Sequence, residues 1–344
     1  MAGLCAAVRA RELGAAPVVY EKGSRAGGSM LLSSCVIWRF REWQDFRAEC
    51  PTGDERLQRV VWEQLDDGIA WLESLGAPVV APETGNPRTV GKRFDPHGLT
   101  ETLVRAAGEV RLNEPVEDPQ ILATGGFQGS EPLVAEHIRP AASLRLRANP
   151  WSNGDGLRLA VAQGGQLSAG LDEFYGRNMP DADFTEEDFV SAAQLYGRYA
   201  RVYNERGEEF FEGEVSWSEN DLVQATARQP GARAWYVLDE SVLGQRVRGR
   251  TVAEIAALAP TRVDPAELPF AVPSGARLAV RVSPGITHTI GGLRIDERAR
   301  VVGTDGLHAA GADVGGISTG GYASGLAAAL VFGRIAVESA LDRL

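Results

Sequence analysis

Glycine-rich segments beside predicted strand ends and helix starts constrain this chain more than any other feature of its sequence. They read "RAGGS" (25–29), "ATGG" (123–126), "NGDG" (153–156), "TIGG" (289–292) and "GADVGGISTGGYASG" (311–325). Glycine lets the backbone approach a ligand closely, and a helix start offers unpaired N–H groups with a partial positive charge. A single loop of this kind is common in ordinary turns. The whole ordered series instead predicts an α/β chain that binds a negatively charged ligand on several loops.

The opening segment, "MAGLCAAVRARELGAAPVVYEK", has the pattern of the second half of a dinucleotide-binding βαβ unit. Small and apolar residues at helical spacing run up to Gly14, and a short β-rich run ends at Glu21. In the βαβ fingerprint the third glycine opens the helix, and an acidic residue about 20 positions later binds a ribose hydroxyl. Gly3 and Glu21 fit those two places. The strand and glycines that begin the fingerprint have no counterpart before Met1, so we expect a doubly wound sheet that lacks its central first strand.

Composition places the chain among globular proteins and excludes several functions. Its 344 residues are enough for two domains or for one large domain with an inserted lobe, and 44% of them are hydrophobic. No run of about 18 apolar residues occurs, so we expect no membrane span, and no signal peptide is visible. The net charge of −11 argues against a nucleic-acid-binding surface. Three cysteines without metal or CxxC spacing predict free thiols, no metal site and a cytoplasmic location.

A change of character in the middle of the chain predicts an inserted lobe. Before it, helical and strand patterns alternate, with a helix predicted over 98–110 and with "VRLN" and "ILATGG" as strands of one parallel sheet. Residues 171–283 are rich in aromatic and acidic side chains and mix short strands with short helices. The α/β pattern returns at Pro284 and ends in a long apolar helix over 324–344.

In their order, these motifs resemble those of the FAD-dependent fumarate reductase and succinate dehydrogenase flavoprotein family. The resemblance runs from "MAG" and "YEKGSRAGGS" through "ILATGGFQG", "NGDGLRLA" and "HTIGGLRID" to "GADVGG" and "GGYASGLAAALVFGRIA", and it covers nearly the whole chain. It is closest to the branch of 3-ketosteroid Δ1-dehydrogenase-like oxidoreductases. The resemblance implies a Rossmann-like FAD-binding domain over 1–170 and 284–344, split by an α+β capping domain over 171–283. It also implies FAD as the cofactor and an active site between the two domains.

The family's cofactor-binding residues can be carried over to matching positions in this chain. Gly3 matches the last glycine of the phosphate loop, Glu21 matches the ribose acid, and Lys22, Gly28 and Ser29 match the loop that covers the cofactor. The other matches lie at the strand ends and helix starts nearest the diphosphate and the flavin: Ala123, Thr124, Gly125, Asp155, Gly311, Asp313, Ser324, Gly325 and Leu326. The resemblance implies that Asp313 lies at the ribityl chain of the flavin. A helix cap is the open alternative for Asp155 and Asp313.

His288, Tyr322, Tyr175 and Arg177 are the candidate catalytic residues. His288 precedes "TIGG", where the family places a histidine that contacts substrate, although a lone histidine is often structural. Flavin chemistry needs hydride transfer, a group that handles the proton on the neighbouring carbon, and donors that polarise a carbonyl. Tyr322 and Tyr175 are candidates for donor or base, with interface packing as the alternative for Tyr175. Arg177 lies near the family's second histidine and is expected to bind an acidic group or to form an exposed salt bridge.

These residues favour dehydrogenation or reduction of a C–C bond next to a carbonyl or carboxyl group of a small organic substrate. Fumarate and succinate are disfavoured, because Tyr322 stands where fumarate reductases carry an arginine whose planar fork fits a carboxylate. The electron donor or acceptor stays open.

Two alternative functions belong to other classes of protein. The first is a truncated family member with impaired FAD binding and little or no catalysis. It rests on the first strand and on the meander that the family has between "VRLN" and "ILATGG", neither of which this sequence contains. In that case the chain binds FAD poorly until it is extended upstream. The second, an NAD(P)-dependent dehydrogenase, is disfavoured, because it does not need "ATGG", "GAD" and "SGLAAAL" so far along the chain.

Overall fold

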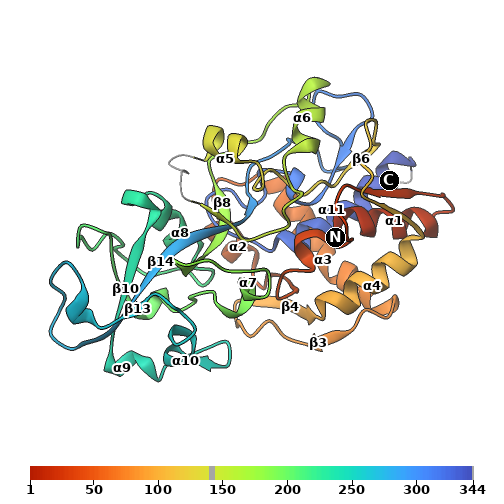
Figure 1. Cartoon of the computed structure of the whole chain (residues 1–344). Helices are drawn as coiled ribbons and strands as arrows, with labels where there is room; N and C mark the ends of the chain where they lie inside the picture. Colours follow the sequence, from red (N-terminus) through yellow and green to blue (C-terminus); the bar gives the residue numbers. More distant parts are fainter. Residues whose placement is uncertain (139–143, 343–344) are drawn as a thin grey trace. The chain divides into compact units, whose positions relative to one another are not determined.

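The computed structural model describes residues 1–138 and 144–342, and the chain divides into two compact units (Figure 1). Unit 1 consists of Met1–Leu133, Ala148–Glu173 and His288–Leu344, and unit 2 consists of Val134–Arg147 and Phe174–Thr287. The capping domain was predicted over 171–283, whereas unit 2 also takes in a segment before that range. Residues 139–143, which belong to the predicted FAD-binding segment, lie outside the described residues. The assignment of a cofactor domain and a capping domain to these segments stays a prediction.

Unit 1 combines helices with short strands. Its helices are α1 (Ala2–Glu12), α2 (Trp43–Glu49), α3 (Glu55–Ser74), α4 (Pro96–Ala107), α6 (Asp155–Ala162) and α11 (Gly325–Ala340), with the 3₁₀ turns η1 (Gly28–Met30) and η5 (Gly311–Asp313). Its strands are β1 (Val18–Glu21), β2 (Val36–Phe40), β3 (Val79–Ala81), β4 (Thr89–Phe94), β5 (Glu109–Leu112), β6 (Ile121–Leu122) and β15 (His308–Ala309). Helix α5 (Glu131–His137) crosses the division between the units.

The parallel strands of unit 1 pair in two separate sets. β1 pairs with β5, with Glu21 opposite Leu112, and β6 pairs with β15, with Leu122 opposite Ala309. Over the described residues, no strand forms hydrogen bonds to both sets. The prediction that "VRLN" and "ILATGG" are strands of one parallel sheet was therefore wrong. The physical reason is that no described strand joins β1 to β6. A third set, β2–β4–β3, is antiparallel.

Helices α1 and α11 pack against each other in the core of unit 1 (Figure 1). α11 is buried along most of its length, as expected for a helix that is apolar on nearly every side. Gly333 permits the close packing, because a Cβ at this position would lie 2.6 Å from the carbonyl oxygen of Ala2. The start of α1 is therefore held in the core, beside α11. None of the described helices has the length and the apolar character needed to cross a bilayer.

A glycine ends one predicted helix of unit 1 earlier than expected. The helix predicted over 98–110 was wrong at its C-terminal end. α4 stops at Ala107, Gly108 has a φ of 87°, and the next residues form β5. A residue in this left-handed region breaks the helical hydrogen-bond series and lets the chain turn into a strand. The helix predicted over 324–344 is found as α11, and its last two predicted residues lie outside the described part.

Unit 2 is built on a sheet around the long strand β14. Its strands are β7 (Arg145–Leu146), β8 (Phe174–Pro180), β9 (Arg201–Tyr203), β10 (Ala234–Asp239), β11 (Arg246–Val247), β12 (Arg250–Thr251), β13 (Arg262–Val263) and β14 (Ala276–Thr289), whose last two residues belong to unit 1. Its helices are α7 (Asp188–Ser191), α8 (Asn220–Ala227), α9 (Glu240–Leu243) and α10 (Val252–Ala256). β14 pairs with β13, β10, β8 and β7, and β10 also pairs with β9. Tyr196 and Tyr236 are fully buried in the core beside this sheet.

Candidate functional site

The first part of the candidate site lies where the start of α1 meets the end of β6. A Cβ on Gly3 would lie 3.3 Å from the Cβ of Ala123, so the helix and the strand end touch here. Gly311 of η5 lies at the same place, because its Cβ would be 3.1 Å from the Cβ of Ala2. α1 has no side-chain cap, so its first N–H groups and its dipole favour an anion at this point.

Asp313 ties together three segments that are far apart in the sequence. Its buried carboxylate accepts hydrogen bonds from the N–H of Thr124, from Thr124 Oγ1 at 2.8 Å and from the N–H of Gly126 at 3.0 Å. Thr124 Oγ1 in turn accepts from the N–H of Gly156 at the start of α6, at 3.1 Å. Burial raises the pKa of Asp313, and these hydrogen bonds lower it in part. The helix-cap alternative was wrong for Asp313, because its carboxylate holds the 123–126 turn instead.

Gly126 continues the site toward the end of β14. Its φ is 83°, and a Cβ at this position would lie 2.6 Å from Thr289 Oγ1, so only glycine fits without strain. Thr289 is 2% exposed, and its hydroxyl has no hydrogen-bond partner among the described residues. A buried hydroxyl without a partner costs free energy, which a ligand atom at this position would offset.

His288 and Tyr322 lie together at the start of α11. Their ring centroids are 6.1 Å apart, and the ring of Trp38 lies 6.0 Å from that of Tyr322. A Cβ on Gly325, the first residue of α11, would lie 2.9 Å from His288 Nε2. His288 Nδ1 is 3.0 Å from the carbonyl oxygen of Thr289, so in the neutral ring Nδ1–H donates and Nε2 is the acceptor nitrogen. Burial lowers the pKa of His288, which keeps the ring neutral near pH 7.

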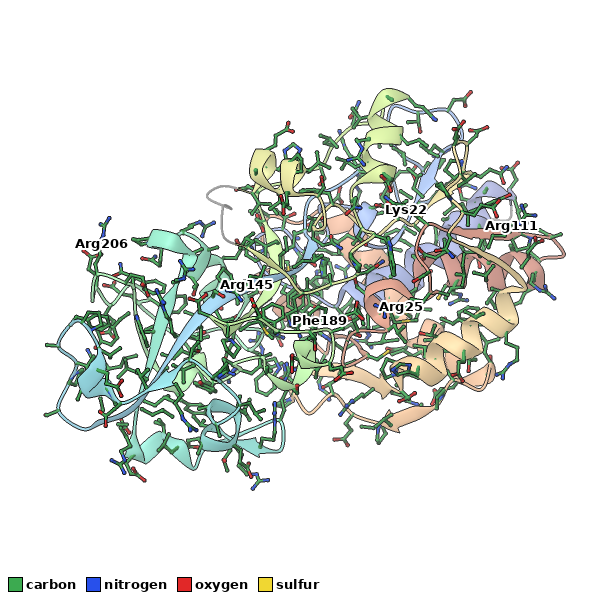
Figure 2. All side chains as sticks on the ribbon, in the orientation of Figure 1. Lys22, Arg25, Arg111, Arg145, Phe189 and Arg206 are labelled. Atoms are coloured by element: carbon green, nitrogen blue, oxygen red, sulfur yellow. The ribbon has the colours of Figure 1, made fainter. Side chains whose placement is uncertain are left out.

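Polar contacts of unit 1 account for most of the remaining predicted cofactor residues. Glu21 accepts a hydrogen bond from the N–H of Gly23 at 2.7 Å. Lys22, labelled in Figure 2, forms an ion pair of 2.6 Å with Asp155. Asp155 is the first residue of α6 and makes no helix-cap hydrogen bond, so the cap alternative was wrong here too. Ser29 Oγ accepts from the N–H of Asn149 at 3.1 Å. The ion pair therefore places Lys22 at the start of α6, and Ser29 lies at Asn149 in the loop that precedes this helix.

The loop that carries Tyr322 is fixed in part by residues that the sequence did not single out. Gln58 of α3 is fully buried, and its Nε2 donates to the carbonyl oxygens of Cys50 at 2.9 Å and Ile317 at 2.8 Å. The N–H of Gly320 donates to Glu173 Oε2 at 2.8 Å. Ser324 then caps α11, with its Oγ accepting from the N–H of Ala327 at 3.3 Å. Neither Gln58 nor Trp38 belongs to a motif, so no local signal identifies them.

Tyr175 and Arg177 lie in unit 2, two residues apart on β8 and therefore on the same face of the strand. The guanidinium carbon of Arg177 lies 5.0 Å from the centre of the Tyr175 ring. Arg177 is 5% exposed, so an exposed salt bridge was the wrong alternative for this residue. Its charge acts on Glu219, another buried residue of unit 2 that the sequence analysis missed.

We name the connected residues of unit 1 the flavin strip. It comprises Gly3, Ala123–Gly126, Gly311–Asp313, His288–Thr289 and Ser324–Leu326. Both α1 and α11 start on it, so unpaired N–H donors are available at two places, and the hydroxyl of Thr289 adds a third donor. A diphosphate and the acceptor atoms of a flavin match donors of this kind. The residues present therefore fit FAD. Over residues 1–138 and 144–342, no three potential metal ligands lie together.

Replacing Gly126 by alanine is expected to weaken FAD binding by about tenfold or more. The added Cβ would lie 2.6 Å from Thr289 Oγ1, so the 123–126 turn must shift within the flavin strip, and overpacking of this kind costs on the order of 1 to 3 kcal/mol. Flavin absorbance during titration of the apoprotein with FAD measures the affinity. Gly306→Ala is the matched control, because Gly306 also has a positive φ, of 74°, but has no atom within 4 Å of its Cβ position. Equal losses of FAD affinity in the two variants would contradict the assignment of Gly126 to the cofactor site.

Comparison with known proteins places the chain in a family. The model of the family described as FAD binding domain matches residues 116–326. The chain is 25% identical to the probable fumarate reductase Ifc3 of Shewanella frigidimarina (strain NCIMB 400) over 451 aligned residues, covering 98% of this chain and 73% of the relative.

Solved structures share the fold. The 3-ketosteroid-Δ4-(5α)-dehydrogenase of Rhodococcus jostii RHA1 has a TM-score of 0.70 at 19% identity, covering 98% of this chain and 94% of that one. The 3-ketosteroid Δ1-dehydrogenase of Sterolibacterium denitrificans has a TM-score of 0.69 at 15% identity, covering 99% and 98%. None of these relatives supports the alternative of a truncated, non-catalytic protein. The chain therefore belongs to the FAD binding domain family, as an FAD-dependent oxidoreductase of the fumarate reductase and succinate dehydrogenase flavoprotein type.

Proposed function

We propose that the protein transfers a hydride between FAD and a carbon–carbon bond next to a carbonyl or carboxyl group of a small organic substrate. The observation that carries this proposal is the position of His288 and Tyr322, with ring centroids 6.1 Å apart, beside the first residue of α11. Bound FAD supplies the redox chemistry, as acceptor or donor of the hydride. Residues of the flavin strip would hold it.

The two rings divide the acid–base work. Tyr322 O–H donates a hydrogen bond to the substrate oxygen, which stabilises the negative charge that develops there and acidifies the neighbouring carbon. His288 is neutral because burial lowers its pKa, so Nε2 can take the proton from that carbon, or return it in the reverse direction. The partial positive charge at the start of α11 also favours the neutral ring. In unit 2, Tyr175 stays a candidate donor or base and Arg177 a candidate for binding an acidic group.

We propose a ketone-activated substrate in preference to fumarate or succinate. A phenol donates one hydrogen bond to a carbonyl oxygen, whereas binding a carboxylate in two places needs the planar fork of an arginine. The ring of Tyr322 contacts the rings of His288 and Trp38. This aromatic environment suits an apolar ring system better than a dicarboxylate. The cytoplasmic location also stays a proposal; Cys5, Cys35 and Cys50 are free and buried.

Anaerobic photoreduction of the flavin-loaded protein, followed by reoxidation with different acceptors, tests the proposed substrate class. We expect enones to reoxidise the flavin faster than enoates, and enoates faster than dicarboxylates such as fumarate. The absorbance of the oxidised flavin reports each rate. A preference for fumarate over every enone would rule out the role given to Tyr322.

Removing the hydroxyl of Tyr322 is expected to slow the reaction with enones and leave the flavin bound. In Tyr322→Phe we expect turnover to fall by about 10²- to 10³-fold, the loss typical of one oxyanion donor. Stopped-flow reoxidation with an enone measures this rate. Tyr20→Phe is the control, because Tyr20 is 37% exposed on β1 and takes no part in the proposed chemistry. If both variants kept their turnover, a different residue would have to polarise the carbonyl.

A further inference from the structure

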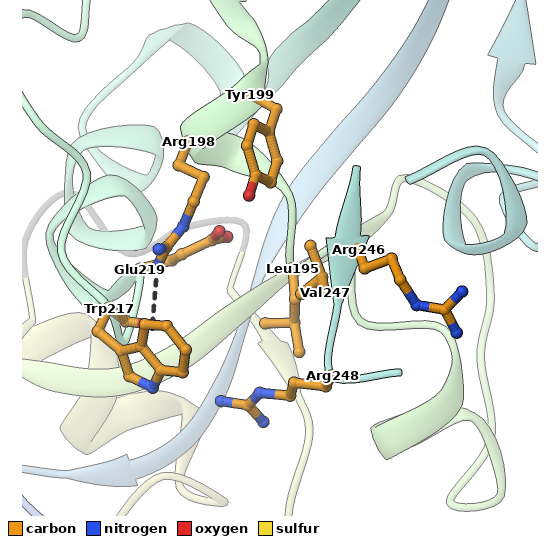
Figure 3. Close-up of a pocket in the computed structure, with 8 residues that line it drawn as sticks. All are labelled: Leu195, Arg198, Tyr199, Trp217, Glu219, Arg246, Val247 and Arg248. Carbon is orange, nitrogen blue, oxygen red and sulfur yellow. Dashed lines mark hydrogen bonds between the residues drawn. The ribbon is translucent and has the colours of Figure 1, made fainter. Parts of the chain in front are cut away.

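Unit 2 contains a small pocket, of about 70 Å³, that is lined by three arginines and one carboxyl group (Figure 3). The arginines are Arg198, Arg246 and Arg248, and the carboxyl group is that of Glu219. Arg248 points toward Trp217, whereas Arg246 points away from both Trp217 and Glu219 (Figure 3). All of these residues belong to unit 2, and none belongs to the flavin strip.

Glu219 neutralises little of this positive charge. It is 4% exposed, and its φ of 54° is rare for a residue with a side chain. Burial raises its pKa to about 7, against the opposing effects of Arg177, Arg198 and Arg248. The other groups that face Glu219 are the N–H of Gly197 and the hydroxyls of Tyr196 and Tyr236. A carboxyl group with this pKa is partly protonated near neutral pH, so it offsets the charge of the three arginines that line the pocket only in part.

The rest of the pocket wall is mainly apolar, with one hydroxyl, that of Tyr199. Leu195, Val247 and the ring of Trp217 supply the apolar part, and Trp217 is 41% exposed although it is a large aromatic residue. Arg198 holds Trp217 in place: its Nη2 lies 3.4 Å from the carbonyl oxygens of Ser216 and Trp217, and its guanidinium carbon lies 4.9 Å from the ring centre. A fixed, exposed aromatic ring beside a positive charge is typical of a binding surface.

We propose that this pocket binds a small organic carboxylate with an aromatic or apolar body. Arg248 contacts the carboxylate, and the body packs against Trp217, Leu195 and Val247. The chemistry follows from the lining, because guanidinium groups pair with carboxylates and the apolar side chains offer contact area to an apolar body, with the Tyr199 hydroxyl as a further donor to the carboxylate. This pocket takes no part in the proposed reaction, so the proposal is tested by measuring ligand binding.

Calorimetric titration of the flavin-loaded protein with benzoate tests the proposal, with benzamide as the neutral analogue of the same shape. We expect benzoate to bind and benzamide to bind at least about tenfold more weakly, since it lacks the charge that Arg248 recognises. Equal binding of the two probes, or no binding of benzoate at millimolar concentration, would overturn the proposal.

Arg248→Asn is the decisive variant. Arg248 and Gly249 form the turn between β11 and β12 with φ values of 49° and 89°, and Asn-Gly is the sequence that such a turn prefers, so the hairpin is kept. We expect its affinity for benzoate to fall by about 10- to 100-fold. Arg206→Gln removes the same charge from an exposed position of unit 2 that does not line the pocket, and it is expected to lose less than about threefold. Similar losses in the two variants would show a general charge effect and contradict the site.

The pH dependence gives a second test. Glu219 is mostly neutral at pH 6 and mostly ionised at pH 8, so wild-type protein should bind benzoate about fivefold more tightly at pH 6, where no carboxylate repels the ligand. Benzoate itself is ionised at both pH 6 and pH 8. In Glu219→Gln the affinity for benzoate should be the same at the two pH values. If the variant kept the pH dependence of the wild type, Glu219 would not be part of the binding site.

Discussion

We expect the His288→Ala protein to keep its flavin and to lose turnover by about 10²- to 10⁴-fold, the contribution of one positioned acid–base group. The side chain lies at the start of α11, with Nδ1 held by the carbonyl oxygen of Thr289 and Nε2 as the acceptor. Alanine removes that acceptor and leaves the amides of Ser324–Leu326 in place. Steady-state turnover and the flavin-to-protein absorbance ratio measure the two effects separately.

Acid provides a second check on the same residue. Burial lowers the pKa of His288 below its ordinary value of 6.5, so its neutral form persists as the pH falls to that value and is lost only below it. Turnover that depends on neutral His288 should therefore be constant down to about pH 6.5 and fall at lower pH. The unfolded chain takes up this proton at higher pH than the folded one, so acid also lowers the free energy of unfolding.

His97→Ala is the matched control for His288→Ala, because His97 is an exposed histidine on α4. Its turnover, its flavin content and its pH profile should equal those of the wild type. Unchanged turnover in His288→Ala would remove His288 from the site, whereas a protein that lost its flavin would show a structural role instead.

Replacing Asp313 by alanine is expected to abolish FAD binding and to lower the free energy of unfolding by about 2 to 4 kcal/mol. The carboxylate is 1% exposed and is the acceptor for Thr124 Oγ1 and for the N–H groups of Thr124 and Gly126. Alanine leaves these buried donors without a partner, and each such group costs on the order of 1 to 3 kcal/mol. The turn at 123–126 then loses the geometry that places it beside Gly3. Urea unfolding and titration with FAD measure the two losses.

Two further variants separate the hydrogen bonds of Asp313 from its general effect on folding. Asp313→Asn keeps one acceptor oxygen, so it should retain part of the stability and bind FAD more weakly than the wild type. Asp172→Ala removes an exposed carboxylate from the same unit and should change the free energy of unfolding by less than about 0.5 kcal/mol. An Asp313→Ala protein as stable as Asp172→Ala would contradict the role given to this carboxylate.

Sequence patterns predicted the local elements well where a stop signal was present. α1 ends just before Gly14, where its sequence pattern was predicted to stop, and Gly14 has a positive φ. The helix predicted through residue 110 failed because its pattern stayed compatible with a helix beyond Gly108. The order of the glycine-rich segments was also enough to identify the family and FAD, since each segment is recognised from a few neighbouring residues.

Only the tertiary structure decided which of these residues meet. Thr124 and Asp313 are 189 positions apart, and nothing in either motif shows that one carboxylate fixes the other turn. The same holds for Trp38 beside Tyr322, for Gln58 under the loop at Ile317 and for the separate pairing of β1 and β6. The burial that raises the pKa of Glu219 is likewise a property of the folded unit, because the residue itself is an ordinary glutamate in a polar stretch. Conformational preference acts over a few neighbouring residues, so the local sequence determines it. Contacts, burial and the charge environment of a residue depend on distant segments that only the fold brings together.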